Sequence, residues 1–392
     1  MHKKTILILL LSLTAFTFQA QDQKNRMKEA KWSIKMANTI LTSADSLIYY
    51  VDRNPKWAYD VAFLGMAIDR LGNTDVRYSK YMEDWVNHFV TTDGSVLDYK
   101  LNEYNLDRIF PGRDIITVYK RNPEPKYRIA LDNFIEQLKT HPKTNSGGYW
   151  HKNIYPSQMW LDGIFMASTF MAQYAKEFNK PEWFDVACTQ TKMIYDKTLD
   201  SESGLLMHAW DESHSQKWCD PMTGKSHYPW SRAMGWYILA IEDILEYLPD
   251  NHTARADLLS ILQKTCDALI RVRDPKTGLW FQVLNYGGRE GNYLEGSGSA
   301  MFTYAFARGA HRNWLNKKYL SIAYTSFDAI IKELITVDGK GLVTMHNICG
   351  GCGLGGNPYR DGTYEYYVHE KRIDNDTKGV APFIMAAIEL DR

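Results

Sequence analysis

Hydrophobic and polar positions divide the chain into two kinds of helical segment that alternate. In the first kind, apolar residues recur at a spacing of about 3.6 with lysine and glutamate on the other face, as in a helix that covers a core on one side. These segments span residues 27–50, 76–89, 127–138, 181–199, 254–272 and 317–335. The second kind is rich in glycine, alanine and aromatic residues. These segments span residues 57–71, 107–119, 160–178, 230–248, 296–310 and 379–390. Glycine lowers helix stability, and close packing between backbones is a common reason for its presence.

A turn that contains glycine together with aspartate or asparagine recurs between these segments. The turns are Asp93-Gly94-Ser95, Asn145 to Gly148, Asp200 to Gly204, Asp274 to Gly278 and Asp338 to Gly341. Their separation of roughly 50 to 75 residues fits a closed array of helical hairpins. We therefore predict an all-α fold, an (α/α)6 barrel with a buried inner ring and an outer ring that faces water. The alternative is an open α-solenoid, which would lack the aromatic residues where inner helices start.

The N-terminus is typical of a secretory signal. Met1-His2-Lys3-Lys4 precedes an apolar run over residues 6–18, and Ala20 is the predicted last residue of the signal. No cysteine follows the run, so a lipoprotein anchor is not expected. No later apolar run reaches membrane-spanning length. We expect residues 1–20 to be a signal peptide, residues 21–392 to be a single domain, and the protein to be periplasmic or secreted.

The composition of the chain indicates which classes of molecule it binds. Lysine plus arginine equals aspartate plus glutamate at 46 each, which gives no support for binding to nucleic acid or an anionic membrane. The 12 tryptophans and 25 tyrosines point instead to stacking against sugars. We expect an oligosaccharide ligand and a monomer or weak homo-oligomer.

Five cysteines cannot all pair within one monomer. The segment Cys349-Gly350-Gly351-Cys352, with His346 nearby, resembles half of a zinc site. A second Cys-x-x-Cys is missing from the sequence, so a flexible glycine-rich loop is the preferred interpretation. We predict neither a metal nor a cofactor.

Asp162 is the first candidate for catalysis. It stands in Trp160-Leu161-Asp162-Gly163, where an apolar and aromatic segment begins. An ionised carboxylate is unfavourable among such neighbours, so we expect a raised pKa and the ability to act as a general acid. The alternative is an aspartate that only caps the helix.

Further polar residues lie where inner helices are predicted to start. These starts meet at one end of a barrel, and their unpaired N–H groups favour an anion there. The candidates are Tyr59, Asp107, Lys152 beside His151, His208, Arg232 and Ser297-Gly298-Ser299. Arg232 stands between Trp230 and Trp236 and suits a planar carboxylate, although it could equally be a stacked structural cation. Asp107 could instead pair with Arg108, and His208 could be a core hydrogen-bonding group.

Four segments resemble the unsaturated rhamnogalacturonyl hydrolases, within the wider group of unsaturated glucuronyl and galacturonyl hydrolases. They are Trp160 to Met166, Trp230 to Tyr237, Glu295 to Met301 and Pro358 to Tyr367. The resemblance covers nearly all of the chain after the signal, and it keeps the order of the motifs. It implies an (α/α)6 barrel, in agreement with the repeat pattern.

The resemblance also implies a reaction. The substrate is an oligosaccharide with a 4,5-unsaturated uronic acid at its non-reducing end, and the enol ether is protonated at C4 and hydrated at C5. Asp162 matches the proton donor, and Asp107 matches the second carboxylate of the pocket. Substrate contacts are implied for Tyr59, Lys152, His208, Arg232, Trp230 and Trp236. The family's Arg-Gly-Asn-Gly-Trp is here Arg232-Ala233-Met234-Gly235-Trp236, which is expected to place Met234 near the pocket.

Three alternatives remain open at this stage. A sister hydrolase would act on unsaturated glucuronyl units of other lyase products, such as ulvan, glycosaminoglycan or glucuronate side chains. A sugar-binding protein without activity would not need both Asp107 and Asp162. An (α/α)6 epimerase would need a histidine pair on inner helices, whereas His151 and His208 both precede them.

Overall fold

The structure is a computed structural model that describes residues 30–392. The predicted signal at residues 1–20 lies outside the described residues, and the domain bounds 21–392 stay a prediction. Within residues 30–392, no helix combines the length and the apolar character that crossing a membrane requires.

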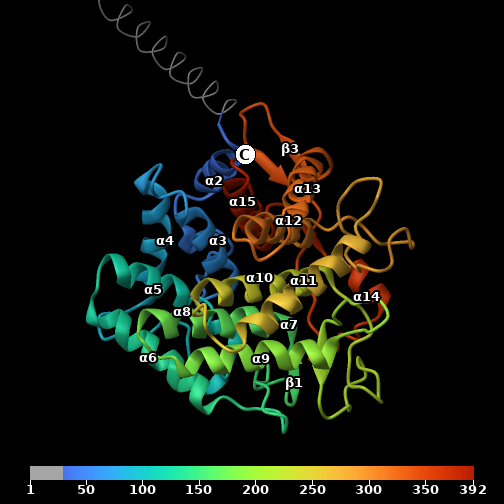
Figure 1. The fold of residues 1–392 in the computed structure, drawn as a ribbon. Coiled ribbons are helices and arrows are strands. Elements are labelled where there is room, and N and C mark those ends of the chain that lie inside the picture. The colour runs from blue at the N-terminus through green and yellow to red at the C-terminus, as the bar shows by residue number, and fades with distance from the viewer. Residues whose placement is uncertain (1–29) are drawn as a thin grey trace, which may run out of the picture.

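Six helices form a closed inner ring (Figure 1). They are α3 (Tyr59–Asp69), α5 (Gly112–Arg121), α8 (Thr169–Glu177), α10 (Ser231–Tyr247), α12 (Gly296–His311) and α15 (Thr377–Glu389). Each packs against the next, and α15 packs against α3, which closes the ring. Two short elements lead into α8, namely α7 (Leu161–Gly163) and the π-helical turn η4 (Ile164–Ser168).

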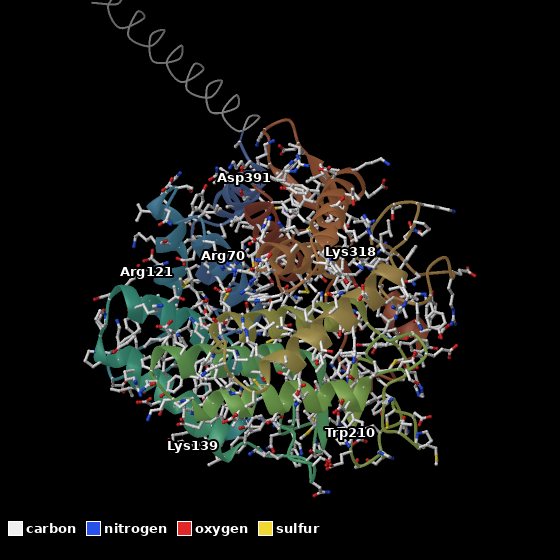
Figure 2. The ribbon with its side chains drawn as sticks, viewed as in Figure 1. Arg70, Arg121, Lys139, Trp210, Lys318 and Asp391 are labelled. Atoms are coloured by element: carbon white, nitrogen blue, oxygen red, sulfur yellow. The ribbon has the colours of Figure 1, made fainter. Side chains whose placement is uncertain are left out.

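Each inner helix is covered by one outer helix. The outer helices are α2 (Trp32–Ser43), α4 (Val76–Phe89), α6 (Pro125–Thr140), α9 (Glu182–Thr198), α11 (Arg255–Arg271) and α13 (Lys318–Leu334). Five of them follow their inner partner in the chain, whereas α2 covers α15, so the two ends of the described chain meet. Figure 2 shows Lys139 and Lys318 on α6 and α13, and both side chains are exposed. The predicted (α/α)6 barrel is confirmed.

Small residues allow the inner helices to approach closely. Every residue of α12 from Gly296 to Ala310 is buried. A methyl group added at Gly298 would lie 1.9 Å from the Ser231 hydroxyl oxygen and 3.1 Å from the Ser231 backbone carbon on α10. The glycines that weaken these segments as isolated helices are therefore required by the packing.

The recurring turns have a common backbone geometry. Their glycines adopt positive φ angles between 74° and 93°, a region that side chains disfavour. These glycines are Gly94, Gly147, Gly204, Gly278 and Gly341. In four of the turns an aspartate carboxylate accepts a backbone N–H from within the turn, as Asp274 does from Thr277 at 2.9 Å.

Three small antiparallel pairs of strands join the helices. The pairs are β1 (Gln158–Trp160) with β2 (Ala209–Asp211), β3 (Ile335–Val337) with β4 (Val343–Met345), and β5 (Ile348–Cys349) with β6 (Arg372–Ile373). A short helix, α14 (Tyr364–His369), precedes β6. Three 3-10 turns complete the described elements: η1 (Leu47–Tyr49), η2 (Leu101–Glu103) and η3 (Leu106–Arg108).

Several predicted helix bounds were wrong, most clearly in two segments. The segment 107–119 begins as η3, and α5 starts only at Gly112, because Pro111 has no N–H with which to continue a helix from Asp107. The segment 27–50 contains α2 from Trp32, and η1 is a separate turn whose N-cap is Ser46, which accepts from the N–H of Ile48.

Candidate active site

The starts of the inner helices meet at one end of the ring, as the sequence predicted. Tyr59 is the first residue of α3, and Arg232 and Ser297 are the second residues of α10 and α12. The Nη1 of Arg232 donates to the Ser297 hydroxyl at 3.3 Å. Burial, followed by the nearby charge of Asp107, raises the pKa of the Tyr59 phenol, so this group is neutral near pH 7.

The β1–β2 pair brings Asp162 beside His208. Trp160 pairs with Ala209, and the N–H of Leu161 donates to the carbonyl of His208 at 3.1 Å. As a result, Asp162 Oδ2 lies 3.3 Å from His208 Nε2, a contact that is not aligned as a hydrogen bond. The carboxyl group makes no capping bond to its helix, so the interpretation of Asp162 as a helix cap was wrong.

His208 is held from its other side by a tyrosine. Its ring is fully buried, and its Nδ1 lies 2.8 Å from the hydroxyl of Tyr367 on α14. Asp162 keeps 13% of its side chain exposed, and within residues 30–392 it has no lysine or arginine partner. The site therefore contains a partly accessible carboxyl group whose charged or polar neighbour is a histidine.

Asp107 has the opposite surroundings. Its Oδ2 lies 2.6 Å from Lys152 Nζ, and its Oδ1 lies 3.4 Å from His151 Nε2. Burial raises the pKa of Asp107, but the charge and hydrogen bond of Lys152, together with His151 and Arg108, outweigh burial and hold that pKa below its usual value. The predicted alternative of a pair with Arg108 was wrong, because Arg108 binds Asp98 at 3.0 Å.

His151 is close enough to both aspartates for their charges to affect its pKa. Its ring stacks on Trp160 with 4.6 Å between centroids. Burial lowers the pKa of His151 to about 4, with the charges of Asp107 and Asp162 acting against burial. His151 is therefore neutral near pH 7, and its buried Nδ1 has no hydrogen-bond partner within the described chain.

Trp230 lies between His208 and Arg232. Its ring centroid is 4.8 Å from that of His208, and the Arg232 guanidinium lies 4.7 Å from the same ring. The indole N–H of Trp230 donates to Gln282 Oε1 at 3.1 Å. Arg232 is 1% exposed and also donates to the carbonyl of Cys349. The guanidinium is thus anchored by stacking and by a backbone carbonyl, as in the structural alternative, although it remains at the ring of helix starts.

Trp236 and Met234 are both buried on α10. Trp236 is fully buried against Phe63 and Phe165, with Tyr59 at 6.0 Å between ring centroids. Met234 is also fully buried, and its sulfur accepts the N–H of Leu206 at 3.3 Å. Burial alone does not separate Met234 from the site, since Arg232 is also buried, so the expectation that Met234 lies near the pocket stays a prediction.

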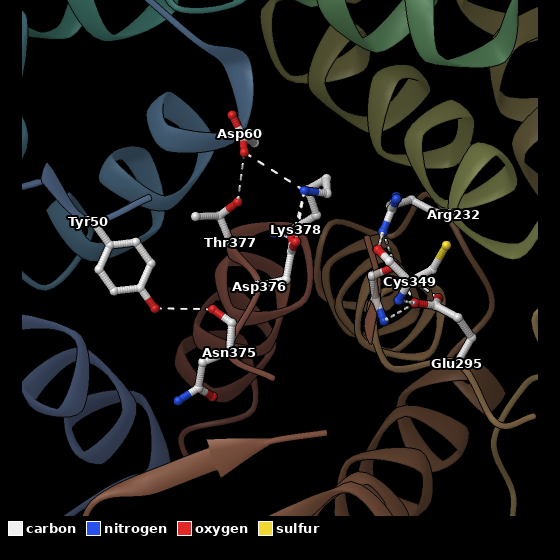
Figure 3. A network of polar contacts seen from close by, with 10 residues as sticks. Tyr50, Asp60, Arg232, Glu295, Cys349, Asn375, Asp376, Thr377 and Lys378 are labelled. Carbon is white, nitrogen blue, oxygen red and sulfur yellow. Dashed lines mark hydrogen bonds and ion pairs between the residues drawn. The ribbon is translucent and has the colours of Figure 1, made fainter. Parts of the chain in front are cut away.

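Sequence reasoning missed several polar residues around these helix starts. Figure 3 shows Arg232, Cys349 and Glu295 in one cluster and Asp60, Asp376, Thr377 and Lys378 in another. Glu295 caps α12 through the N–H groups of Ser297 and Gly298 and accepts a third N–H from Cys349 at 3.0 Å. Lys378 Nζ lies 2.8 Å from Asp376 and 3.8 Å from Asp60.

Two of the missed residues had a signal in the sequence. Glu295 immediately precedes a predicted inner helix, and Tyr367 ends one of the four motifs. Lys378 was missed because the last inner helix was predicted to start at Gly379, whereas α15 begins at Thr377. Among residues 30–392, no group of three or more His, Cys, Asp or Glu side chains is arranged to hold a metal ion.

Comparisons with known proteins identify the family of this chain. The model of Glycosyl Hydrolase Family 88 matches residues 32–392. A solved structure of a family 105 glycoside hydrolase from C. acetobutylicum has 38% sequence identity to this chain and a TM-score of 0.89, and the match covers 92% of this chain and 99% of that one. Unsaturated rhamnogalacturonyl hydrolase YesR from Bacillus subtilis is 23% identical over 290 residues, which cover 72% of this chain and 77% of YesR.

A more distant structure shares the fold. An unsaturated glucuronyl hydrolase specific for heparin is 13% identical with a TM-score of 0.64, covering 94% of this chain and 96% of that one. The family match spans nearly every residue that the structure describes, including both aspartates and the six inner helices. The chain therefore belongs to glycosyl hydrolase family 88 and is a glycoside hydrolase built on an (α/α)6 barrel.

Proposed function

We propose that this protein removes a 4,5-unsaturated galacturonyl residue from the non-reducing end of oligosaccharides that a lyase has released from rhamnogalacturonan or related pectin. The main support is the contrast between the two aspartates. Asp107 is neutralised by Lys152, whereas Asp162 faces His208 without a lysine or arginine partner among the described residues. The name of the relative YesR and the order of the four motifs support the same substrate class.

The proposed reaction is hydration of an enol ether. Asp162 in its protonated form donates a proton to C4, which creates an oxocarbenium-like centre at C5. Water adds at C5, and its second proton returns to the Asp162 carboxylate. The resulting hemiketal opens and releases the remaining sugar chain. This route differs from hydrolysis at the acetal carbon by two carboxyl groups on opposite sides of a glycosidic bond.

His208 and Tyr367 position the proton on Asp162. When the Tyr367 hydroxyl donates to Nδ1, a neutral His208 carries its hydrogen on Nε2, which faces Asp162 Oδ2. This arrangement favours the carboxylate that remains after proton transfer. When Asp162 is protonated, the opposite tautomer presents its unprotonated Nε2 to Asp162 and donates from Nδ1 to Tyr367. The pair thus suits both protonation states of Asp162.

Positive charge and helix starts favour the uronate carboxylate. The Lys152 side chain is 23% exposed, whereas Arg232 is buried. The unpaired N–H groups at the starts of the inner helices add partial positive charge. We propose that Lys152 pairs with the substrate carboxylate. The buried Arg232, which stacks on Trp230, adds positive charge to the site.

A panel of disaccharides tests this proposal. The wild-type protein is incubated with unsaturated galacturonyl-rhamnose, an unsaturated glucuronyl disaccharide and the saturated galacturonyl counterpart of the first. We expect loss of the double-bond ultraviolet absorbance with the first substrate and no cleavage of the saturated one. In D2O, the early product carries deuterium at C4. Cleavage of the saturated sugar at a similar rate, or a product without deuterium at C4, contradicts hydration.

The same panel tests a second candidate, a glucuronyl hydrolase. Unsaturated 3S-rhamnoglycuronyl hydrolase from Formosa agariphila is 25% identical over 162 residues, which cover 40% of this chain and 42% of that protein. Faster turnover of the glucuronyl substrate than of the galacturonyl one would favour this candidate. Deuterium at C4 is expected in either case, so the substrate and the mechanism are tested separately.

We also propose that the protein is exported and acts as a monomer or a weak homo-oligomer. The sequence of residues 1–20 supports export. Fractionation of cells that express the full chain, followed by N-terminal sequencing, should find a shortened protein outside the cytoplasm. A full-length N-terminus in the cytoplasmic fraction would contradict export.

A further inference from the structure

The five cysteines divide into one close pair and three separate residues. The sulfur atoms of Cys349 and Cys352 lie 3.5 Å apart, and both side chains are buried. Cys188, Cys219 and Cys266 are also buried, but each lies apart from the others on its own element or loop. The close pair is thus the one place in this chain where two thiols can react with each other.

The pair contacts residues that hold side chains of the candidate active site. The carbonyl of Cys349 accepts from Arg232, and the N–H of Cys349 donates to Glu295 (Figure 3). The amide of Gln282 donates to both sulfurs, at 3.2 Å and 3.5 Å, and to the carbonyl of Tyr367 at 3.0 Å. These contacts join the cysteines to the residues that hold Arg232 and His208.

The surroundings shift the pKa values of the two buried thiols in opposite directions. The hydrogen bond from Cys352 lowers the pKa of the Cys349 thiol, and the Arg232 charge acts in the same direction against burial. Burial raises the pKa of Cys352. A thiolate on one sulfur and a thiol on the other is the starting state for disulfide exchange.

Of the two glycines between the cysteines, Gly350 packs tightly against Ile373 and Lys371, whereas Gly351 does not. A disulfide requires about 2.05 Å between its sulfurs, so the pair must approach by about 1.5 Å. An added methyl group at Gly351 would lie 3.8 Å from Arg232, an ordinary van der Waals contact, so this glycine is not tightly packed. Cys349 is fixed in β5 by its pairing with Arg372, so Cys352 is the residue that moves.

We propose that Cys349 and Cys352 form a reversible disulfide behind Arg232 by exchange with a small-molecule disulfide such as oxidised glutathione. The Cys349 thiolate attacks one sulfur of the oxidant, which gives a mixed disulfide and releases one glutathione thiolate. Cys352 loses its proton to solvent and attacks the sulfur of Cys349, which releases the second glutathione thiolate. The two cysteines are oxidised by two electrons, and the oxidant is reduced to two thiols.

Thiol titration of the full chain tests this site. The folded protein is equilibrated with reduced and oxidised glutathione at a series of ratios, quenched with acid, and alkylated after unfolding. We expect the oxidised form to lose two hydrogen atoms by intact mass and to keep three alkylated cysteines. Peptide mapping should place the bond between Cys349 and Cys352. Five alkylated cysteines at every ratio would overturn the proposal.

Matched variants separate this site from general oxidation. Cys352→Ser should abolish the bond, and Cys188→Ser should leave it unchanged, since Cys188 is an isolated buried thiol on α9. Because the fold holds the two sulfurs in contact, the equilibrium constant for oxidation should be at least about tenfold larger in the native protein than in urea. If the equilibrium constant for oxidation were smaller in the native protein than in urea, the fold would oppose the bond, and the proposal would also be overturned.

Discussion

Two aspartates at neighbouring positions of the barrel illustrate how surroundings assign different roles to one residue type. Asp107 is paired with Lys152 and is ionised, so it acts as a fixed charge. Asp162 contacts His208, which can accept or donate a proton at the same nitrogen. The proposed proton donor is therefore the aspartate without a permanent counter-charge.

The Tyr367→Phe variant tests how His208 is positioned. Removal of the hydroxyl leaves the buried Nδ1 of His208 without its partner, so the tautomer that faces Asp162 is no longer fixed. We expect kcat to fall by about tenfold or more while KM changes little, and the free energy of unfolding to fall by about 1–3 kcal/mol because the buried Nδ1 is left unpaired. Steady-state kinetics with the unsaturated substrate measure both constants.

Tyr364→Phe is the matched control. Tyr364 belongs to the same short helix as Tyr367. Its hydroxyl donates to the backbone carbonyl of Glu290 at 2.9 Å and not to His208. An equal loss of kcat in both variants would indicate a structural effect of α14 and would refute a positioning role for Tyr367.

The sequence allowed some of these residues to be predicted and not others. Asp162, Arg232 and Tyr59 could be predicted because each stands at the start of an inner helix, which the alternating pattern reveals. Tyr367 belongs to α14, which lies outside the repeat, so helical spacing gave no reason to direct it at His208. The Lys152 pair with Asp107 depends on a bridge between Asn105 and Lys152, a contact between distant segments.

At the scale of elements, the patterns predicted which segments form helices better than where the helices begin. All twelve predicted segments overlap a helix of the barrel, because burial sets the spacing of apolar residues. The π-helical turn η4, two residues after Asp162, was not predicted. Its extra residue per turn is accommodated by packing against α9 and α10, and π-helical turns are frequent at functional sites.

The contact between α10 and α12 provides a test at this scale. In Gly298→Ala the new methyl group collides with Ser231, both its hydroxyl and its backbone. We expect a loss of about 1–3 kcal/mol in the free energy of unfolding, because the two helices must separate slightly. Urea denaturation measures this loss.

Gly339→Ala is the control for a glycine in open space, where an added methyl group meets no atom within 4 Å. Its stability should be close to that of the wild type. Equal stability of both variants would refute the requirement for close approach between α10 and α12.

At the scale of the whole molecule, the half of α10 and α12 away from their starts carries buried charge. Asp243 binds both Arg113 and Arg308, which joins α5, α10 and α12. Its neighbour Glu242 is fully buried, and neither of its oxygens has a hydrogen-bond partner within the described residues. Burial raises the pKa of Glu242 well above its usual value, although Arg308 acts against burial, so this carboxyl is protonated in the folded protein.

This buried acid makes stability depend on pH. The unfolded chain releases the Glu242 proton at a lower pH than the folded chain does, so stability falls as pH rises above the unfolded pKa. The slope reaches at most about 1.4 kcal/mol per pH unit for one proton. In Glu242→Gln this term is absent, so the variant should gain stability relative to the wild type between pH 5 and pH 8.

Denaturation at both pH values measures this gain. Glu136→Gln on α6 is the control, because Glu136 is 54% exposed and pairs with Lys139 at the surface. A stability difference between Glu242→Gln and the wild type that is the same at pH 5 and pH 8 would contradict a protonated Glu242 in the folded state.

The most direct test of the proposed function is turnover by Asp162→Asn. The substitution keeps the size of the side chain, and the carboxyl group makes no helix-capping bond, so the fold and substrate binding should persist. Asp185→Asn on α9, where the side chain is 76% exposed, serves as the control. We predict that loss of the substrate's ultraviolet absorbance slows by about 10²- to 10⁴-fold in Asp162→Asn and is unchanged in Asp185→Asn. Turnover by a folded Asp162→Asn protein at the wild-type rate would contradict proton donation by Asp162.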